Sequence, residues 1–188
     1  MTFLAVLALI AVVLALATIV GSRLSKTHVA ASRQRLDATL DEVWDVVTNF
    51  AEYPKWRPGL TRVDAGPEID GQPTWFEYCA PKIKVQLQFT EFEPKKRLVT
   101  RLVGDNLPIF GAWEYEFTEE GEGTLLTITE VDKVYNPLLR LFTRLVIPHN
   151  AALDVFLIAL AKRFGSPASP EHLSLRIDVP ANFPNDLG

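Results

Sequence analysis

The sequence contains few residues that could bind a metal or form a covalent cross-link. Its 188 residues include one cysteine, Cys79, and three histidines. A single cysteine excludes an intrachain disulfide and weakly favours a reducing compartment. His28, His149 and His172 lie far apart in the chain, and no two have the spacing of metal ligands. The common hydrolase and phosphate-loop motifs are also missing. We therefore expect no metal site, no cofactor and no catalytic residue that sequence alone can name.

Clusters of basic residues are equally scarce. The net charge is −4 and no block of lysines or arginines occurs. Because phosphate backbones are bound by clustered positive charge, nucleic acid is not an expected partner. Hydrophobic residues make up 48% of the chain, which is enough for one domain with a packed core. We find no internal repeat and no second domain.

The amino-terminal segment is the longest apolar run in the chain. From Phe3 to Val20 it is interrupted by Thr18 alone, and no charge precedes Arg23. Eighteen helical residues rise about 27 Å, close to the thickness of the hydrocarbon core of a bilayer. Four basic residues then precede the first acidic residue, Asp37. We predict a single-pass anchor over residues 1–22 and a juxtamembrane linker over 23–28. Positive charge gathers on the cytoplasmic side, so we expect the domain there.

A cleaved signal peptide is the alternative interpretation of this segment. Ala15, Leu16 and Ala17 have the small-residue pattern of a cleavage site. However, the segment has no basic residue at its start, and its apolar run is longer than a usual signal core. We favour the membrane anchor.

In the rest of the chain, hydrophobic residues recur either at every second position, as in strands, or at every third to fourth position, as in helices. A strand is expected at 29–38 and a helix at 40–50, followed by strands at 83–90, 97–104, 112–120 and 123–135. A long apolar stripe at helical spacing then runs from 137 to 164, where Pro148 should kink the helix. Residues 166–188 are rich in proline, and we expect an extended or disordered tail. The order predicts an α+β fold in which antiparallel strands pack on a long terminal helix.

Three stretches of this sequence resemble a known family. "LDEVWDVVTNFAEYPKWRPGL" has a Val-Trp helix followed by a corner formed by Tyr53, Pro54 and Trp56, and it resembles the opening of the SRPBCC superfamily. This superfamily is also called START-like or polyketide cyclase/dehydrase-like. "WEYEFTEEGEGTLLTITEV" is similar to its late strand pair, and "NPLLRLFTRLV" to the start of its last helix. The resemblance covers residues 29–165 and implies a helix-grip fold, in which a curved sheet wraps a long helix and encloses a hydrophobic cavity.

Candidate ligand-binding residues follow from the strand faces, the helix stripe and the aromatic corner. They are Trp56, Phe89, Trp113, Tyr115, Phe142, Leu145, His149 and Phe156. The loop at 103–113 has an apolar tip that could cover the cavity, enter lipid or pack on its own domain; its candidate lid residues are Leu107, Ile109 and Phe110. The aromatic corner could equally be plain core. His149 could face a ligand as an acid or base, or it could simply face solvent or be hydrogen-bonded, and we favour the second interpretation.

Two carboxylates leave a further question open. Glu130 and Asp132 share a strand face with Leu126 and Ile128. If that face points inward, they are cavity acids with raised pKa values. We instead expect them at the solvated end of the strand. An error of one residue in register would invert any of these faces.

Three functions remain possible. The first is a membrane-anchored binder or carrier of a hydrophobic small molecule, such as a lipid, a quinone or a polyketide-like compound. The second is a cyclase-like or aromatase-like enzyme acting on such a molecule. The third is a membrane-anchored protein-interaction module with no ligand. A large dry cavity would favour the carrier, convergent polar groups in the cavity the enzyme, and a filled core the module.

Overall fold

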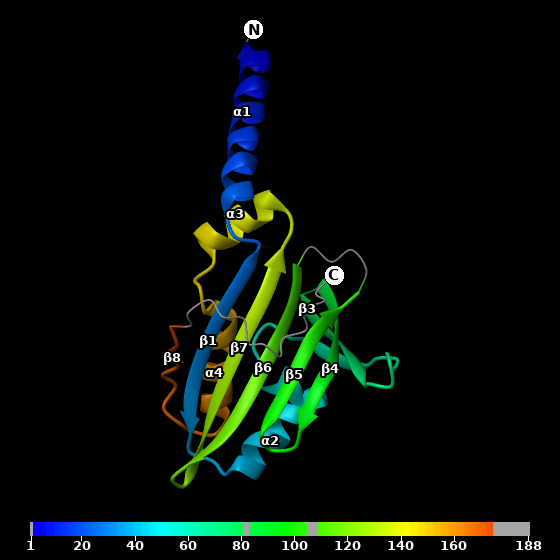
Figure 1. Ribbon diagram of the computed structural model, residues 1–188, viewed down its shortest axis with the longest axis vertical. Coiled ribbons are helices and arrows are strands. Elements are labelled where there is room, and N and C mark those ends of the chain that lie inside the picture. The colour runs from blue at the N-terminus through cyan, green and yellow to red at the C-terminus, as the bar shows by residue number, and fades with distance from the viewer. Residues whose placement is uncertain (1, 81–82, 105–108, 175–188) are drawn as a thin grey trace.

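A projecting helix and a curved sheet dominate the structure. The computed structural model describes residues 2–80, 83–104 and 109–174 (Figure 1). Helix α1, Thr2–Arg23, extends away from the rest of the chain. Its residues Phe3–Arg23 are long and apolar enough to cross a membrane, and none of its most apolar stretch is buried. A helix of this kind near the amino terminus fits either a membrane span or a signal sequence.

The chain then enters the domain through one strand and two short helices. Strand β1 is Thr27–Leu36, α2 is Leu40–Thr48, and the 3-10 helix η1 is Phe50–Lys55. Thr39 caps α2 through a reciprocal pair with Glu42, in which the Glu42 amide donates to the Thr39 hydroxyl and the Thr39 amide to the Glu42 carboxylate. These two bonds fix where α2 begins.

The strands form one antiparallel sheet. They are β2 (Arg62–Ala65), β3 (Thr74–Ala80), β4 (Ile83–Glu93), β5 (Arg97–Val103), β6 (Ile109–Glu120), β7 (Gly123–Val134) and β8 (Glu171–His172), together with β1. Among the described residues their order is β2-β3-β4-β5-β6-β7-β1-β8. The β6–β7 hairpin is paired along its whole length and turns at Gly121, whose φ of 64° suits glycine. The sheet curves around the last helix, as the family resemblance implies (Figure 1).

The predicted long terminal helix is two helices. Helix α3 spans Pro137–Val146 and α4 spans Ala151–Arg163, and their axes are bent by 50°. The cause is Pro148, which lacks an amide hydrogen and holds the preceding residue, Ile147, in an extended conformation. Helix α4 packs on the sheet through fully buried residues that include Leu153, Phe156, Leu157 and Leu160. Helix α3 leaves the sheet and crosses the base of α1 (Figure 1).

A close joint connects α3 to the end of α1. The guanidinium of Arg140 is buried and donates to the carbonyls of Gly21, Leu24, Val134 and Tyr135 at 2.9–3.0 Å. The backbones meet where Gly21 faces Pro137, so closely that a Cβ on Gly21 would lie 2.0 Å from the Pro137 carbonyl oxygen. The two helices are therefore packed backbone to backbone at this point.

The start of the tail is ordered against the sheet. The Asp37 amide donates to the Ser166 hydroxyl, and β8 pairs with β1, where Arg33 forms two hydrogen bonds with Glu171. Residues 166–174, the first part of the segment expected to be extended or disordered, therefore lie against the sheet. Residues 175–188 lie outside the described chain.

Candidate functional site

A cavity of about 590 Å³ lies between the inner face of the sheet and the helices. Strands β3 to β7, the η1 turn and one residue of α3 contribute to its wall. Its lining residues are Phe50, Tyr53, Arg57, Trp75, Glu77, Cys79, Ile83, Val85, Leu87, Thr100, Leu102, Ile109, Gly111, Trp113, Tyr115, Glu130, Asp132 and Leu139. The volume falls in the range of small-molecule sites, about 300–1,000 Å³.

The strand faces that line the cavity are the apolar faces of β4 and β6. Ile83, Val85 and Leu87 of β4 point into it, as do Trp113 and Tyr115 of β6. Further along the same faces, Phe89 and Phe117 pack in the hydrophobic core. The alternation of apolar and polar residues placed these side chains on one face of each strand, and in the structure this face points inward.

The aromatic corner joins α2 to α4 and forms one end of the cavity wall. The hydroxyl of the fully buried Tyr53 donates to the Val47 carbonyl at 2.6 Å. The ring of Trp56 packs edge-on against Tyr53 and Phe156, at centroid distances of 5.0 and 5.3 Å. Tyr53 lines the cavity, whereas Trp56 does not and instead packs against Phe156. The indole Nε1 of Trp56 is buried without a hydrogen-bond partner.

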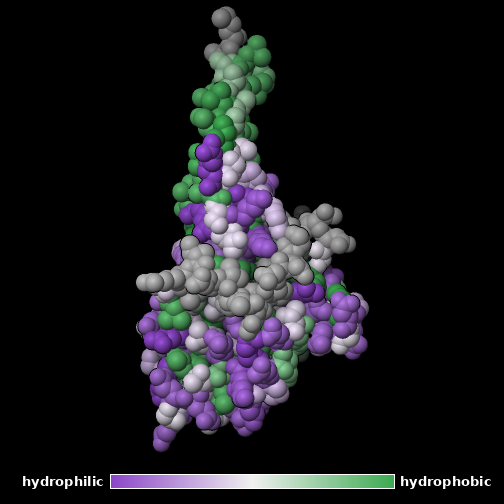
Figure 2. All heavy atoms as spheres, viewed as in Figure 1, coloured by the Kyte–Doolittle hydropathy of each residue, from purple (hydrophilic) through white to green (hydrophobic). Residues whose placement is uncertain are grey.

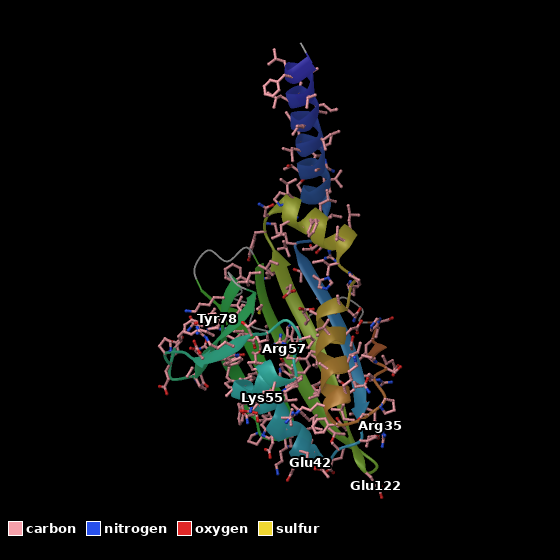
Figure 3. All side chains as sticks on the ribbon, turned by 180° about the vertical axis from the view of Figure 1, so that it is seen from behind. Arg35, Glu42, Lys55, Arg57, Tyr78 and Glu122 are labelled. Carbon is pink, nitrogen blue, oxygen red and sulfur yellow. The ribbon has the colours of Figure 1, made fainter. Side chains whose placement is uncertain are left out.

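A buried ion pair lies in the cavity wall beside this corner. One guanidinium nitrogen of Arg57 donates to both carboxylate oxygens of Glu77, at 2.9 and 3.0 Å, and Trp75 Nε1 donates to the same carboxylate. The Arg57 guanidinium also lies 5.6 Å from the ring centroids of Tyr53 and Phe156. Figure 3 shows Arg57 near the middle of the domain. The pair therefore supplies charged groups, held in fixed positions, in an otherwise apolar wall.

Two carboxyl groups face the cavity from β7. Glu130 is 7% exposed and accepts a hydrogen bond from Trp113 Nε1 at 2.8 Å. Its side chain also hydrogen-bonds Asp132, its neighbour on the same strand face. Burial raises the pKa of Glu130, and burial together with the charge of Glu130 raises the pKa of Asp132 to about 8. Near neutral pH the pair therefore holds a proton. The expectation that these residues face solvent is wrong, because Glu130 is buried and both carboxyl groups line the cavity.

A glycine makes room for the Asp132 carboxyl. Gly111 of β6 is paired directly with Asp132 across the hairpin. A Cβ at position 111 would lie 2.0 Å from Asp132 Oδ1. Any other residue here would push the carboxyl out of its place.

A second cleft of about 330 Å³ lies next to the first, on the side of α1. It is lined by basic and imidazole side chains, among them Lys26, His28, Arg144 and His149, and it shares Ile109, Glu130 and Asp132 with the cavity. His149 Nε2 is 2.9 Å from the Val29 carbonyl oxygen. Burial, His149 and Arg144 lower the pKa of His28.

The remaining predicted site residues are dispersed. Phe142 and Leu145 do not line the cavity: they lie on α3 and are 54% and 76% exposed. The break at Pro148 explains this, because it turns α3 away from the sheet. Ile109 lines both the cavity and the cleft, whereas Phe110 packs edge-on against Tyr135. Both belong to strand β6 and not to the expected loop, and Leu107 lies outside the described residues.

Sequence reasoning missed the Arg57–Glu77 pair. The segment 74–80, "TWFEYCA", does contain a signal, since Glu77 shares a strand face with Trp75 and Cys79, both of which line the cavity. A lone acid on an apolar face indicates a buried partner. No group of three or more potential metal ligands occurs among the residues that the structure describes.

The comparisons with known proteins agree with this geometry. A profile of the family described as "Polyketide cyclase / dehydrase and lipid transport" matches residues 26–164, and the chain belongs to this family. A search of curated proteins gave no match.

Solved structures share the fold at low identity. The Zhui aromatase/cyclase from Streptomyces sp. R1128 is 13% identical, with a TM-score of 0.60 over 74% of this chain and 94% of that one. A START superfamily protein from Mycobacterium smegmatis is 17% identical, with a TM-score of 0.57 over 73% and 97%. Norcoclaurine synthase from Thalictrum flavum is 14% identical, with a TM-score of 0.57 over 73% and 92%. The chain spans half the length of the di-domain ARO/CYC StfQ. At these identities the likeness shows the helix-grip fold.

Proposed function

We propose that this protein binds a hydrophobic small molecule in the cavity between sheet and helices and carries or presents it at a membrane to which α1 anchors the domain. The observation that carries the proposal is the cavity of about 590 Å³ with its mainly apolar and aromatic wall. Such a wall binds by removing apolar ligand surface from water, at about 25 cal/mol per Å². A domain packed solid, as an interaction module without a ligand requires, has no such space.

The polar groups of the wall narrow the ligand class. The Arg57–Glu77 pair and the Glu130–Asp132 pair lie in an otherwise apolar wall. In an apolar cavity, a few fixed hydrogen-bonding groups orient a ligand that carries oxygen atoms. A lipid, a quinone or a polyketide-like molecule has this combination of apolar body and oxygen functions. We place the domain on the cytoplasmic side because of the basic residues that follow α1.

The first test is ligand uptake by the full chain in detergent. Native mass spectrometry should detect a co-purifying lipid-soluble molecule, and a hydrophobic probe with environment-sensitive emission should bind saturably at one site. Val85→Trp, which fills the cavity, should reduce probe affinity at least tenfold. Glu122→Trp, on the β6–β7 turn at the far end of the domain, adds the same side chain and should leave affinity unchanged (Figure 3). Non-saturable uptake, or equal loss in both variants, would reject the carrier.

Catalysis is the second candidate, and the Glu130–Asp132 pair favours it. A carboxyl pair that holds one proton in an apolar cavity can donate that proton to a substrate oxygen and take one from a carbon or hydroxyl. Incubating the recovered ligand with the protein distinguishes the two. An enzyme would change its mass or isomeric form, and Glu130→Gln with Asp132→Asn would stop the change. A carrier would return the ligand unaltered in both cases.

A further inference from the structure

We propose that α3 is a membrane-surface helix, whose exposed apolar face lies in the same bilayer that α1 spans. The inference rests on the membrane anchor of the proposed function and adds a second contact with lipid. It concerns a surface that the cavity does not use.

The outward face of α3 is apolar. Leu138, Phe142 and Leu145 follow one another at helical spacing and are 38%, 54% and 76% exposed, and Val146 next to them is 60% exposed. The inward face holds the buried Arg140. A helix at the surface of a soluble domain has the opposite arrangement, with its apolar stripe on the core. Large exposed apolar side chains gathered on one short helix indicate a partner that is itself apolar.

The position of α3 points to lipid as that partner. The helix crosses the base of α1, where the Gly21–Pro137 contact and the Arg140 hydrogen bonds join the two (Figure 1). The surface of α1 is apolar down to its last turns, where hydrophilic residues begin (Figure 2). The exposed face of α3 thus lies at the level where α1 leaves the hydrocarbon core. An amphipathic helix lying in the plane of the interface fits this depth.

The charge around the joint fits a lipid surface and opposes a second copy of the chain. No acidic residue occurs in residues 1–36 or in residues 133–153, the two segments that meet here. Arg23, Lys26 and Arg144 are exposed around the joint. Anionic lipid headgroups attract such a basic rim, whereas two copies placed face to face would repel. Vesicles containing an anionic lipid are therefore the matching surface.

Helix α3 also separates the bilayer from the cavity. Leu139, which follows the exposed Leu138, lines the cavity together with Ile109 of β6. One helix turn thus has lipid on one side and the ligand space on the other. The arrangement suits a ligand that enters from the lipid phase.

The experiment measures the depth of single labels in the full chain. A nitroxide is attached to Leu145→Cys, Leu14→Cys or Glu122→Cys in a Cys79→Ser background, with Cys79→Ala as a second background. The protein is placed in nanodiscs of phosphatidylcholine and phosphatidylglycerol. Collision with oxygen, which dissolves in lipid, is compared with collision with a water-soluble nickel chelate. We expect the Leu145 label to favour oxygen at least fivefold more than the Glu122 label does.

Each outcome has one meaning. If the Leu14 label favours oxygen but the Leu145 label behaves like the Glu122 label, α3 does not touch lipid and this inference fails alone. If the Leu14 label is also in water, the membrane anchor itself fails. Spin–spin broadening at Leu145 would show a second copy on this face, and shielding from both reagents without broadening would show another protein. Either result would overturn the assignment to lipid.

Discussion

At the scale of single residues, the carboxyls of Glu130 and Asp132 are the most informative groups. Neither forms an ion pair with a lysine or arginine among the described residues. Burying two acids without a cation is tolerated because the pair keeps a proton. The sequence presented both residues on one strand face. Deciding whether that face meets solvent required knowing that it lines a cavity whose wall also includes Leu139 of α3.

The Asp132 pKa predicts how stability depends on pH. An unfolded aspartate ionises near pH 4, whereas folded Asp132 ionises at about 8. Between these values the folded chain holds a proton that the unfolded chain has lost, so the free energy of unfolding falls as pH rises. The contribution is fully present below about pH 4 and is lost as pH rises through about 8, at up to about 1.4 kcal/mol per pH unit.

Asp132→Asn should remove most of this dependence, because an amide does not ionise. Denaturant unfolding of the full chain in detergent, followed by tryptophan fluorescence from pH 5 to pH 9, measures it. We expect the variant to gain stability relative to wild type on going from pH 5 to pH 8. Parallel pH curves for the two proteins would show that Asp132 is ionised in the folded chain throughout.

Trp56 allows a test that separates packing from hydrogen bonding. Trp56→Ala removes the ring that supports Phe156 and should destabilise the domain by about 3 kcal/mol. Trp56→Phe keeps an aromatic ring and loses an N–H that has no partner, so its cost should stay below about 1.5 kcal/mol. Equal losses in the two variants would show that an aromatic ring at this position does not supply the packing on Phe156.

At the scale of elements, the alternation of apolar and polar residues located the strands, whereas the helical stripe did not reveal where its helix packs. Alternation located strands β4 to β7, but the β7 face that carries Glu130 was expected to meet solvent. Helix α3 begins within the stretch "NPLLRLFTRLV", which resembles the start of the family's last helix, and the Asn136 side chain caps it. The apolar stripe from 137 to 164 was misleading about direction. Leu138, Phe142 and Leu145 continue the stripe in sequence. The turn at Pro148, however, directs α3 away from the sheet on which α4 packs. An apolar stripe indicates that a helix face packs on an apolar partner, but it does not identify that partner.

The joint between α1 and α3 depends on the absence of a side chain at Gly21. Alanine is ordinarily the better helix former, by up to about 1 kcal/mol. Here its Cβ would collide with the Pro137 backbone, so Gly21→Ala should loosen the joint. Hydrogen exchange of the α3 amides in detergent should then become at least tenfold faster. Val20→Ala, an exposed position on the same helix, serves as the control, and unchanged exchange in Gly21→Ala would mean that the helices pack less closely.

At the scale of the whole molecule, composition and order of elements predicted the fold class, and the family profile confirms it. What sequence could not supply was pairing over distance. Arg57 and Glu77 are 20 residues apart, and their ion pair forms because η1 packs against the β2–β3 edge of the sheet. Such contacts depend on the curvature of the sheet, which no local pattern encodes.

The orientation of the chain across a membrane gives the last prediction. A reporter active in the cytoplasm alone, fused after residue 188, should be active, and one active outside the cytoplasm alone should be silent. The mature chain should keep its first residues when its amino terminus is sequenced. The opposite reporter pattern, or a chain that begins near Thr18, would show that α1 is a signal sequence.

The short connection between α1 and β1 limits how far the domain can travel. Three residues, Leu24 to Lys26, separate the two elements, and Arg140 holds the carbonyl of the first of them. A carrier on a long flexible tether can search the cytoplasm for its recipient. This domain has no slack, so it can neither swing outward nor turn over on its stalk. If the domain carries a ligand at a membrane as we propose, its recipient has to come to it, either as a soluble protein that docks at the exposed far end or as a neighbour that diffuses in the same plane.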